Sequence, residues 1–232
     1  MTRQNLLLIP GLLCTGRLWR DQSAALADLA DIQIGEHHLD DNLSDIAARI
    51  LRSAPDRFAL AGLSMGGYVA FEIWRQAPER VQRIALLDTR ATTDTPAETQ
   101  RRKDLIALAR KGRFTGIHER LMPLFIHHDR LDDRELTGAV AEMAEATGRD
   151  GFINQTKALM TRPDARPACA TIDVPALVLC GRQDALTPVA MHQEMADLIA
   201  DADLKIIEDC GHLSTMERPE AVNEAMREWL QG

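Results

Sequence analysis

The chain is built around a strand, a sharp turn and a helix: Phe58-Ala59-Leu60-Ala61-Gly62-Leu63-Ser64-Met65-Gly66-Gly67-Tyr68-Val69-Ala70. The apolar start predicts a buried strand, and Gly62 to Gly66 fits G-x-S-x-G, the pattern of a nucleophile elbow. A side chain at Gly62 or Gly66 would collide with the packed strand and helix, so both positions need glycine. Ser64 then opens the helix, where free backbone N–H groups face its oxygen. The alternative is an ordinary glycine-rich turn with a capping serine.

The length and charge of the chain argue against a nucleic-acid-binding protein and against a membrane-spanning protein. The chain has 232 residues, enough for one domain with a full core. It carries 27 Lys and Arg against 35 Asp and Glu, a formal charge of -8, which argues against nucleic acid or an anionic membrane as the main partner. The longest apolar run, Leu6 to Leu13, is too short to span a bilayer. We therefore expect a cytoplasmic protein with a small-molecule partner.

Metal and disulfide chemistry are not expected. The four cysteines (Cys14, Cys169, Cys180 and Cys210) show no C-x-x-C spacing and fit neither a zinc site nor a disulfide framework. His127-His128-Asp129 resembles a ligand cluster, but adjacent helical residues point about 100 degrees apart. We predict no metal site and no cofactor.

Apolar runs alternate with helical patterns at both ends of the chain. The expected strands are Asn5–Ile9, Ile32–His37, Phe58–Leu63, Val81–Leu87, Ala176–Cys180 and Leu204–Ile207. Helical spacing between them, as over residues 18–30 and 44–54, is typical of βαβ units. The sequence therefore predicts an α/β fold with a sheet of about six strands, all parallel and flanked by helices.

The middle of the chain predicts helices only. Thr93-Asp94-Thr95-Pro96 starts a helix that is apolar at Leu105, Ile106 and Leu108. Residues 114–126 form a second helical piece that we expect Pro123 to break. Two amphipathic stripes follow, one beginning at Leu136 and one at Phe152. We expect residues 1–90 and 168–232 to form the core and residues 91–167 to form a helical insertion.

Three residues have the chemistry of nucleophilic catalysis. A serine hydroxyl needs a base to take its proton, and the base needs an orienting acid. Asp184 follows the fifth expected strand and His212 follows the sixth, so both should lie at the sheet edge that carries Ser64. Asp88, at the end of the fourth strand, is the rival acid.

The chain resembles the α/β-hydrolase superfamily over nearly its whole length. The matching motifs are Gly62-Leu63-Ser64-Met65-Gly66-Gly67, Pro78-Glu79-Arg80-Val81, Leu86-Leu87-Asp88-Thr89, Gly181-Arg182-Gln183-Asp184 and Gly211-His212. The resemblance implies that Ser64 attacks a carbonyl carbon, that His212 takes the proton and that Asp184 orients His212. It also implies an oxyanion hole made by the backbone N–H groups of Leu12 and Met65. Relatives often carry His-Gly where this chain has Pro10-Gly11, which removes a histidine from that turn.

The side chains beside these turns predict the kind of substrate. The candidate contacts are Leu13, Leu121, Phe125, Leu186 and Leu213, although Leu121 and Phe125 fit core packing equally well. They indicate a small-to-medium, fairly apolar ester. The elbow also resembles those of enol-lactone and C–C bond hydrolases, and a thioesterase, a lyase or a non-hydrolytic receptor are further alternatives. Arg90 is positioned to meet a carboxylate, but we expect it at the surface.

Overall fold

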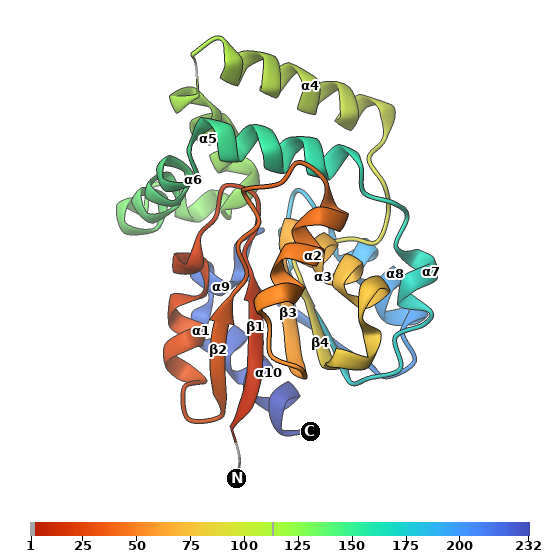
Figure 1. Cartoon of the computed structure of the whole chain (residues 1–232). Helices are drawn as coiled ribbons and strands as arrows, with labels where there is room; N and C mark the ends of the chain where they lie inside the picture. Colours follow the sequence, from red (N-terminus) through yellow and green to blue (C-terminus); the bar gives the residue numbers. More distant parts are fainter. Residues whose placement is uncertain (1–2, 113) are drawn as a thin grey trace.

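The computed structural model describes residues 3–112 and 114–232, with the side chains of residues 115–118 left aside. Residues 1 and 2 of the expected core and residue 113 of the expected insertion lie outside the described part. Figure 1 shows a central sheet with helices on both sides and a group of helices beyond one end. None of the described helices combines the length and the apolar character needed to cross a bilayer.

The sheet has six strands, all parallel, in the order β2-β1-β3-β4-β5-β6. The strands are β1 (Gln4–Ile9), β2 (Ala30–Ile34), β3 (Phe58–Leu63), β4 (Val81–Leu87), β5 (Ala176–Gly181) and β6 (Ala202–Ile207). This confirms the expected α/β fold and strand number. Because every strand runs the same way, all carboxyl ends meet at one edge, which is where functional groups of such sheets gather.

Helices cover both faces of the sheet and its carboxyl edge. Those of the first half are α1 (Arg20–Ala25), α2 (Leu43–Ser53), α3 (Met65–Gln76), α4 (Pro96–Arg110) and α5 (Thr115–Phe125). Those of the second half are α6 (Arg134–Met160), α7 (Arg166–Cys169), α8 (Val189–Leu198), α9 (Ser214–Glu217) and α10 (Pro219–Gln231). Short 3-10 turns occupy Gly16–Trp19, Pro78–Arg80 and His128–Arg130.

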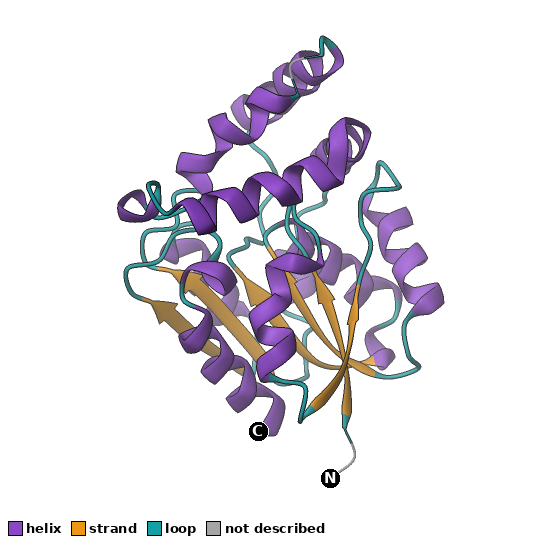
Figure 2. Ribbon diagram, turned by 90° about the vertical axis from the view of Figure 1, so that its left-hand side faces the viewer, coloured by secondary structure: helices purple, strands orange, loops and turns teal. Residues whose placement is uncertain are grey.

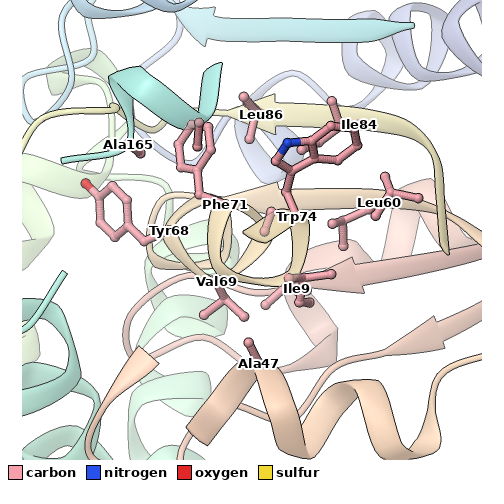
Figure 3. Close-up of a cluster of buried hydrophobic side chains, with 14 of the residues drawn as sticks. Ile9, Ala47, Leu60, Tyr68, Val69, Phe71, Trp74, Ile84, Leu86 and Ala165 are labelled. Atoms are coloured by element: carbon pink, nitrogen blue, oxygen red, sulfur yellow. The ribbon is translucent and has the colours of Figure 1, made fainter. Parts of the chain in front are cut away.

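Two apolar layers hold these helices to the sheet because successive strand side chains point to opposite faces. Leu7 and Ile9 of β1 lie in the layer under α2 and α3, whereas Leu6 and Leu8 lie in the layer under α1 and α10. Figure 3 shows part of the first layer, with Phe71 and Trp74 of α3 between Leu60 of β3 and Ile84 and Leu86 of β4. Fully burying one such side chain contributes about 1.5–3 kcal/mol, so this layer anchors the helix that follows the elbow.

Helices α4, α5 and α6 lie together beyond the carboxyl edge of the sheet (Figures 1 and 2). Both α4 and α5 contact α6, and their described residues contain no strand. The two expected amphipathic stripes belong to α6, which bends at Gly148, where φ is 71°. Glycine adopts this left-handed backbone without a Cβ clash, so it joins the two helical segments.

Three expected elements have different limits in the structure. The helix expected over residues 18–30 is shorter, since α1 ends at Ala25 and β2 begins at Ala30. The strand expected to reach His37 ends at Ile34, which leaves His37 in a loop. The expected break at Pro123 is wrong: α5 continues past it to Phe125, and the N–H of Ile126 bonds to the carbonyl of Met122.

Candidate active site

Ser64 stands on a strained turn between β3 and α3. Its backbone has φ 56° and ψ -112°, an unusual conformation for a residue with a side chain. A Cβ built on Gly62 would lie 2.2 Å from the carbonyl oxygen of Gly66, and one built on Gly66 would lie 2.1 Å from that of Ile9. The glycines therefore bring α3 against β3 and against the end of β1, as the elbow pattern predicts.

A hydrogen-bonded chain links Ser64 to a histidine and a carboxylate. Nε2 of His212 lies 2.8 Å from Oγ of Ser64, and Nδ1 of His212 lies 2.7 Å from Oδ2 of Asp184. Both His212 and Asp184 are buried, with 1% and 4% of their surface exposed. The Nδ1 contact leaves Nε2 to accept the serine proton, which is the geometry of a general base.

Several donors stabilise the Asp184 carboxylate. The backbone N–H groups of Leu186 and Thr187 donate to Oδ1 at 2.8 and 2.9 Å, and the hydroxyl of Thr187 donates to Oδ2 at 2.7 Å. Burial raises the pKa of Asp184, but His212 and these donors outweigh burial and lower the pKa overall. Burial lowers the pKa of His212, and the negative Asp184 outweighs it and raises the pKa overall.

Asp88, the rival acid, binds other partners. Its Oδ1 accepts from the N–H of Gly181 at 3.1 Å, and its Oδ2 accepts from the N–H and hydroxyl of Ser214 at 3.1 and 2.5 Å. Burial, followed by the charge of Asp184, raises its pKa to about 8. Asp88 thus connects the end of β4 to the end of β5 and to the loop that carries His212.

The loop that carries His212 is held by the segment after α5. The carbonyl of Phe125 accepts from the N–H groups of His212 and Leu213, both at 3.1 Å. The buried carboxylate of Glu217 accepts from the N–H of Gly211 at 3.0 Å and from that of His127 at 2.8 Å. These bonds fix the position of the imidazole relative to the helices above the sheet.

A cavity of about 110 Å³ opens beside Ser64 and His212. Its apolar wall is formed by Leu12, Leu105, Leu121, Leu124, Phe125, Phe152, Leu159 and Leu186. Its polar wall includes Tyr68, Arg90, Glu98, Arg101, Arg102, Thr156 and Thr187. Of the expected contacts, Leu121, Phe125 and Leu186 line the cavity, and Leu12, expected for its backbone N–H, lines it too.

Leu13 and Leu213 were expected among the substrate contacts, but neither side chain lines this cavity. Leu13 turns away through a left-handed backbone, φ 61°, and packs with Ala109 and Phe152. Leu213 is 1% exposed and packs into the apolar layer beneath the site. Sequence proximity to a catalytic turn did not predict the direction of either side chain.

Arg90 was expected at the surface, but the structure buries it, with 6% of the residue exposed. It donates to Glu98 at 2.8 Å and to Asp94 at 3.1 Å. Asp94 also accepts from Arg102 at 2.6 Å and from Arg162 at 2.7 Å. This network joins the loop after β4 to α4 and to the end of α6, so the burial of Arg90 is compensated by charge.

The cluster considered for a metal lies apart from this cavity. Side-chain ligand atoms of His127, His128 and Asp129 lie within 4.8 Å of one another. Nδ1 of His127 accepts the N–H of Asp129 at 3.2 Å, so that nitrogen already has a partner. None of the three residues lines the cavity at Ser64.

Comparison with known proteins identifies the family. The family model described as alpha/beta hydrolase fold matches residues 36–219. The chain belongs to the α/β-hydrolase fold family. Among curated α/β-hydrolase relatives, the 2-hydroxy-6-oxononadienedioate/2-hydroxy-6-oxononatrienedioate hydrolase of Klebsiella pneumoniae subsp. pneumoniae is 30% identical over 202 residues, which cover 81% of this chain and 68% of that protein.

Solved α/β-hydrolase structures agree with the fold. A thermophilic esterase from Thermogutta terrifontis, solved with malate bound, has a TM-score of 0.89 at 27% identity, covering 99% of this chain and 90% of its own. The enol-lactonase from Burkholderia xenovorans LB400 has a TM-score of 0.88 at 23% identity, covering 100% of this chain and 93% of its own. The second likeness supports the fold alone.

Proposed function

We propose that this protein is a serine hydrolase that cleaves a carboxylic ester through an acyl-enzyme on Ser64. The observation that carries the proposal is the continuous contact from Oγ of Ser64 through His212 to Asp184, at 2.8 and 2.7 Å. A serine with its base and its orienting acid in this geometry is activated for attack on a carbonyl.

The reaction proceeds in two stages. His212 takes the hydroxyl proton as Ser64 attacks the ester carbonyl, and it returns that proton to the departing alcohol as the C–O bond breaks. Water then attacks the acyl-enzyme, with His212 again accepting a proton, and the acid leaves as Ser64 regains its hydrogen. Asp184 stabilises the imidazolium that forms in both stages.

In each stage the carbonyl oxygen of the substrate becomes an oxyanion, and hydrogen-bond donors must face this oxygen to stabilise its charge. The backbone N–H of Met65, directly after the nucleophile, is one proposed donor and that of Leu12 is the other. The close approach of Gly66 to the carbonyl of Ile9 supports this pairing, because it sets the two turns side by side. Each donor supplies about 3 kcal/mol of transition-state stabilisation.

The cavity supports a small or medium acyl group. Its volume of about 110 Å³ and its leucine and phenylalanine wall favour a short apolar chain. We further propose that residues 91–167 act as a cap over the core formed by residues 1–90 and 168–232, since both α4 and α5 contribute side chains to this wall. Leu121, Phe125 and Leu186 are then substrate contacts.

A carboxylate on the substrate is a second possibility that one observation favours. Arg90, Arg101 and Arg102 line the same cavity, where Arg90 is paired with Glu98 and Asp94 and Arg102 is paired with Asp94. Arg101 is the cation that we propose for a substrate carboxylate. The names of the relatives fit such a substrate, because they include a dienedioate hydrolase and an esterase with bound malate. An enol lactone or a C–C bond substrate that bears a carboxylate is therefore the alternative to a simple ester.

Hydrolysis of a p-nitrophenyl ester series from short to long acyl chains tests the proposal. We expect activity to peak at a short chain and to fall by roughly a millionfold in Ser64→Ala, which removes the nucleophile but not the fold. Ester hydrolysis that survives in Ser64→Ala would contradict the assignment. A matched series of hemiesters with a free carboxylate, assayed with Arg101→Gln, distinguishes a simple ester substrate from one that bears a carboxylate.

A further inference from the structure

The peptide group between Gly11 and Leu12 carries the proposed oxyanion donor of the first turn. The N–H of Leu12 belongs to the same peptide unit as the carbonyl of Gly11. The described part of the chain contains no cis peptide bond, and in a trans unit the two groups point in opposite directions. Any contact that fixes the Gly11 oxygen therefore fixes the direction of the Leu12 N–H.

His37 makes that contact. Its Nε2 lies 2.9 Å from the carbonyl oxygen of Gly11, and the side chain is 3% exposed. A carbonyl oxygen only accepts, so Nε2 of His37 carries the hydrogen. Burial lowers the pKa of His37 to about 4, which keeps the imidazole neutral and in this role at ordinary pH. This histidine comes from the loop after β2.

Gln155 contacts the next peptide unit of the turn, between Leu12 and Leu13. Its Oε1 accepts from the N–H of Leu13 at 3.1 Å, and its side chain is 0% exposed. Leu13 has the left-handed φ of 61°, so the turn is strained and needs such a partner. Because Gln155 belongs to α6, this bond links the helices above the sheet to the turn. Nε2 of Gln155 lies 3.3 Å from Nε2 of His37. This ring nitrogen can donate to Gly11 or accept from Gln155 but not both, and we assign its hydrogen to the shorter contact, the one with the Gly11 oxygen.

We propose that His37 and Gln155 are positioning residues that lock the Gly11–Leu12 peptide with its N–H directed at the oxyanion. The inference rests on the proposed function. The Gly11 oxygen also accepts from the N–H of Cys14 at 3.1 Å, so His37 is a second donor that resists rotation of this peptide. Loss of the His37 donor leaves the oxygen to the Cys14 bond and eases a rotation that would turn the carbonyl toward the oxyanion and repel it. The hydrogen bond to the Gly11 oxygen also polarises the peptide, which makes the Leu12 N–H a stronger donor.

The decisive pair of variants is His37→Leu and His37→Gln. Leucine fills the space without a donor, whereas the glutamine amide can supply an N–H near the position of Nε2. In His37→Leu we expect kcat on the best p-nitrophenyl ester to fall about 10- to 100-fold with KM nearly unchanged, less than the roughly 100- to 1,000-fold expected when an oxyanion donor is removed. His37→Gln should recover most of kcat.

Binding of an alkylboronic acid separates positioning from a merely structural role. Its tetrahedral adduct on Ser64 uses the oxyanion donors, so its affinity should fall in parallel with kcat in His37→Leu and in Gln155→Leu. The affinity for the product alcohol, which does not use those donors, should stay constant. Thermal unfolding of each variant shows whether the fold is retained.

Two neighbouring side chains provide matched controls. Asn154 precedes Gln155 on α6 and donates to the carbonyls of His38 and Leu39 at 3.2 and 3.3 Å, so it ties the same loop without contacting the turn. We expect Asn154→Leu and His38→Leu to keep kcat and boronate affinity within about twofold of wild type.

The outcomes distinguish this inference from the proposed function. Failure of the wild-type protein to hydrolyse any ester in a Ser64-dependent way overturns the function itself. An active wild type with unchanged kcat in folded His37→Leu and Gln155→Leu overturns only the positioning role. A loss in His37→Leu that His37→Gln does not relieve, or a loss equally large in Asn154→Leu, assigns the effect to packing and also overturns it.

Discussion

Asp88 and Asp184 differ in their partners although their places in the fold are alike. Each follows a parallel strand, β4 or β5, and each side chain is almost wholly buried. Asp184 contacts the imidazole of His212 and has a lowered pKa. Within the described part of the chain, Asp88 accepts from neutral donors of Gly181 and Ser214, and burial raises its pKa to about 8.

The difference shows that a strand end places a carboxylate near the chemistry but does not assign its role. A buried carboxylate stays charged when a cation or several strong donors face it. Asp184 has both, because His212 becomes a cation in the proposed reaction and Thr187 donates through its backbone and hydroxyl. Asp88 instead connects two loops and keeps the His212 loop in place.

Replacing Asp184 should have the largest effect. Asp184→Asn keeps the shape but no longer favours the Nδ1–H tautomer or stabilises the imidazolium, so we expect kcat to fall about 10⁴-fold. Steady-state kinetics on the best ester measures this loss. If Asp88→Asn loses as much and Asp184→Asn does not, the two roles are reversed.

The pH profile should separate the two carboxylates next. His212 acts as a base only when neutral, so kcat/KM should drop about tenfold per pH unit below its pKa, which lies above the ordinary imidazole value. Asp184→Asn removes the largest influence that raises this pKa and should move the acid limb to lower pH. Asp88→Asn should move the limb much less, because Asp88 comes after Asp184 among those influences and its pKa of about 8 leaves it largely protonated where the limb falls. A larger movement in Asp88→Asn would contradict the comparison.

Asp88→Asn should mainly affect stability. Its amide oxygen can still accept from Gly181, but the amide NH2 then faces the N–H of Ser214 and leaves a buried donor unpaired. We expect the free energy of unfolding to fall by about 1–3 kcal/mol and kcat by tenfold or less. Urea unfolding beside ester kinetics gives both values, and unchanged stability would show that the Ser214 contact contributes little.

Thr187→Val should have the smallest effect. Valine keeps the size of the side chain but removes the hydroxyl that donates to Oδ2 of Asp184 at 2.7 Å. The two backbone donors to Oδ1 remain, so we expect kcat to fall only about two- to tenfold, the equivalent of one hydrogen bond. A loss comparable to that of Asp184→Asn would mean that Thr187 itself orients His212, whose Nδ1 lies 3.4 Å from the hydroxyl.

Local pattern alone was enough to predict the elbow, the six parallel strands and the edge at which Ser64, Asp184 and His212 gather. Apolar periodicity and glycine spacing act over a few residues, so they can be seen in the sequence. Helix limits were predicted less well, as α1 and Pro123 show, because end positions depend on packing.

Contacts between distant segments were decided only by the tertiary structure. The bond between Leu13 and Gln155 spans 142 positions of the chain, and the contact between Gly11 and His37 spans 26. Likewise, Arg90 is buried because carboxylates on the loop after β4 and on α4 pair with it. The position of the His212 loop decides that the imidazole contacts Asp184 and not Asp88. Side-chain direction depends on which segments pack together, and sequence spacing does not carry that information.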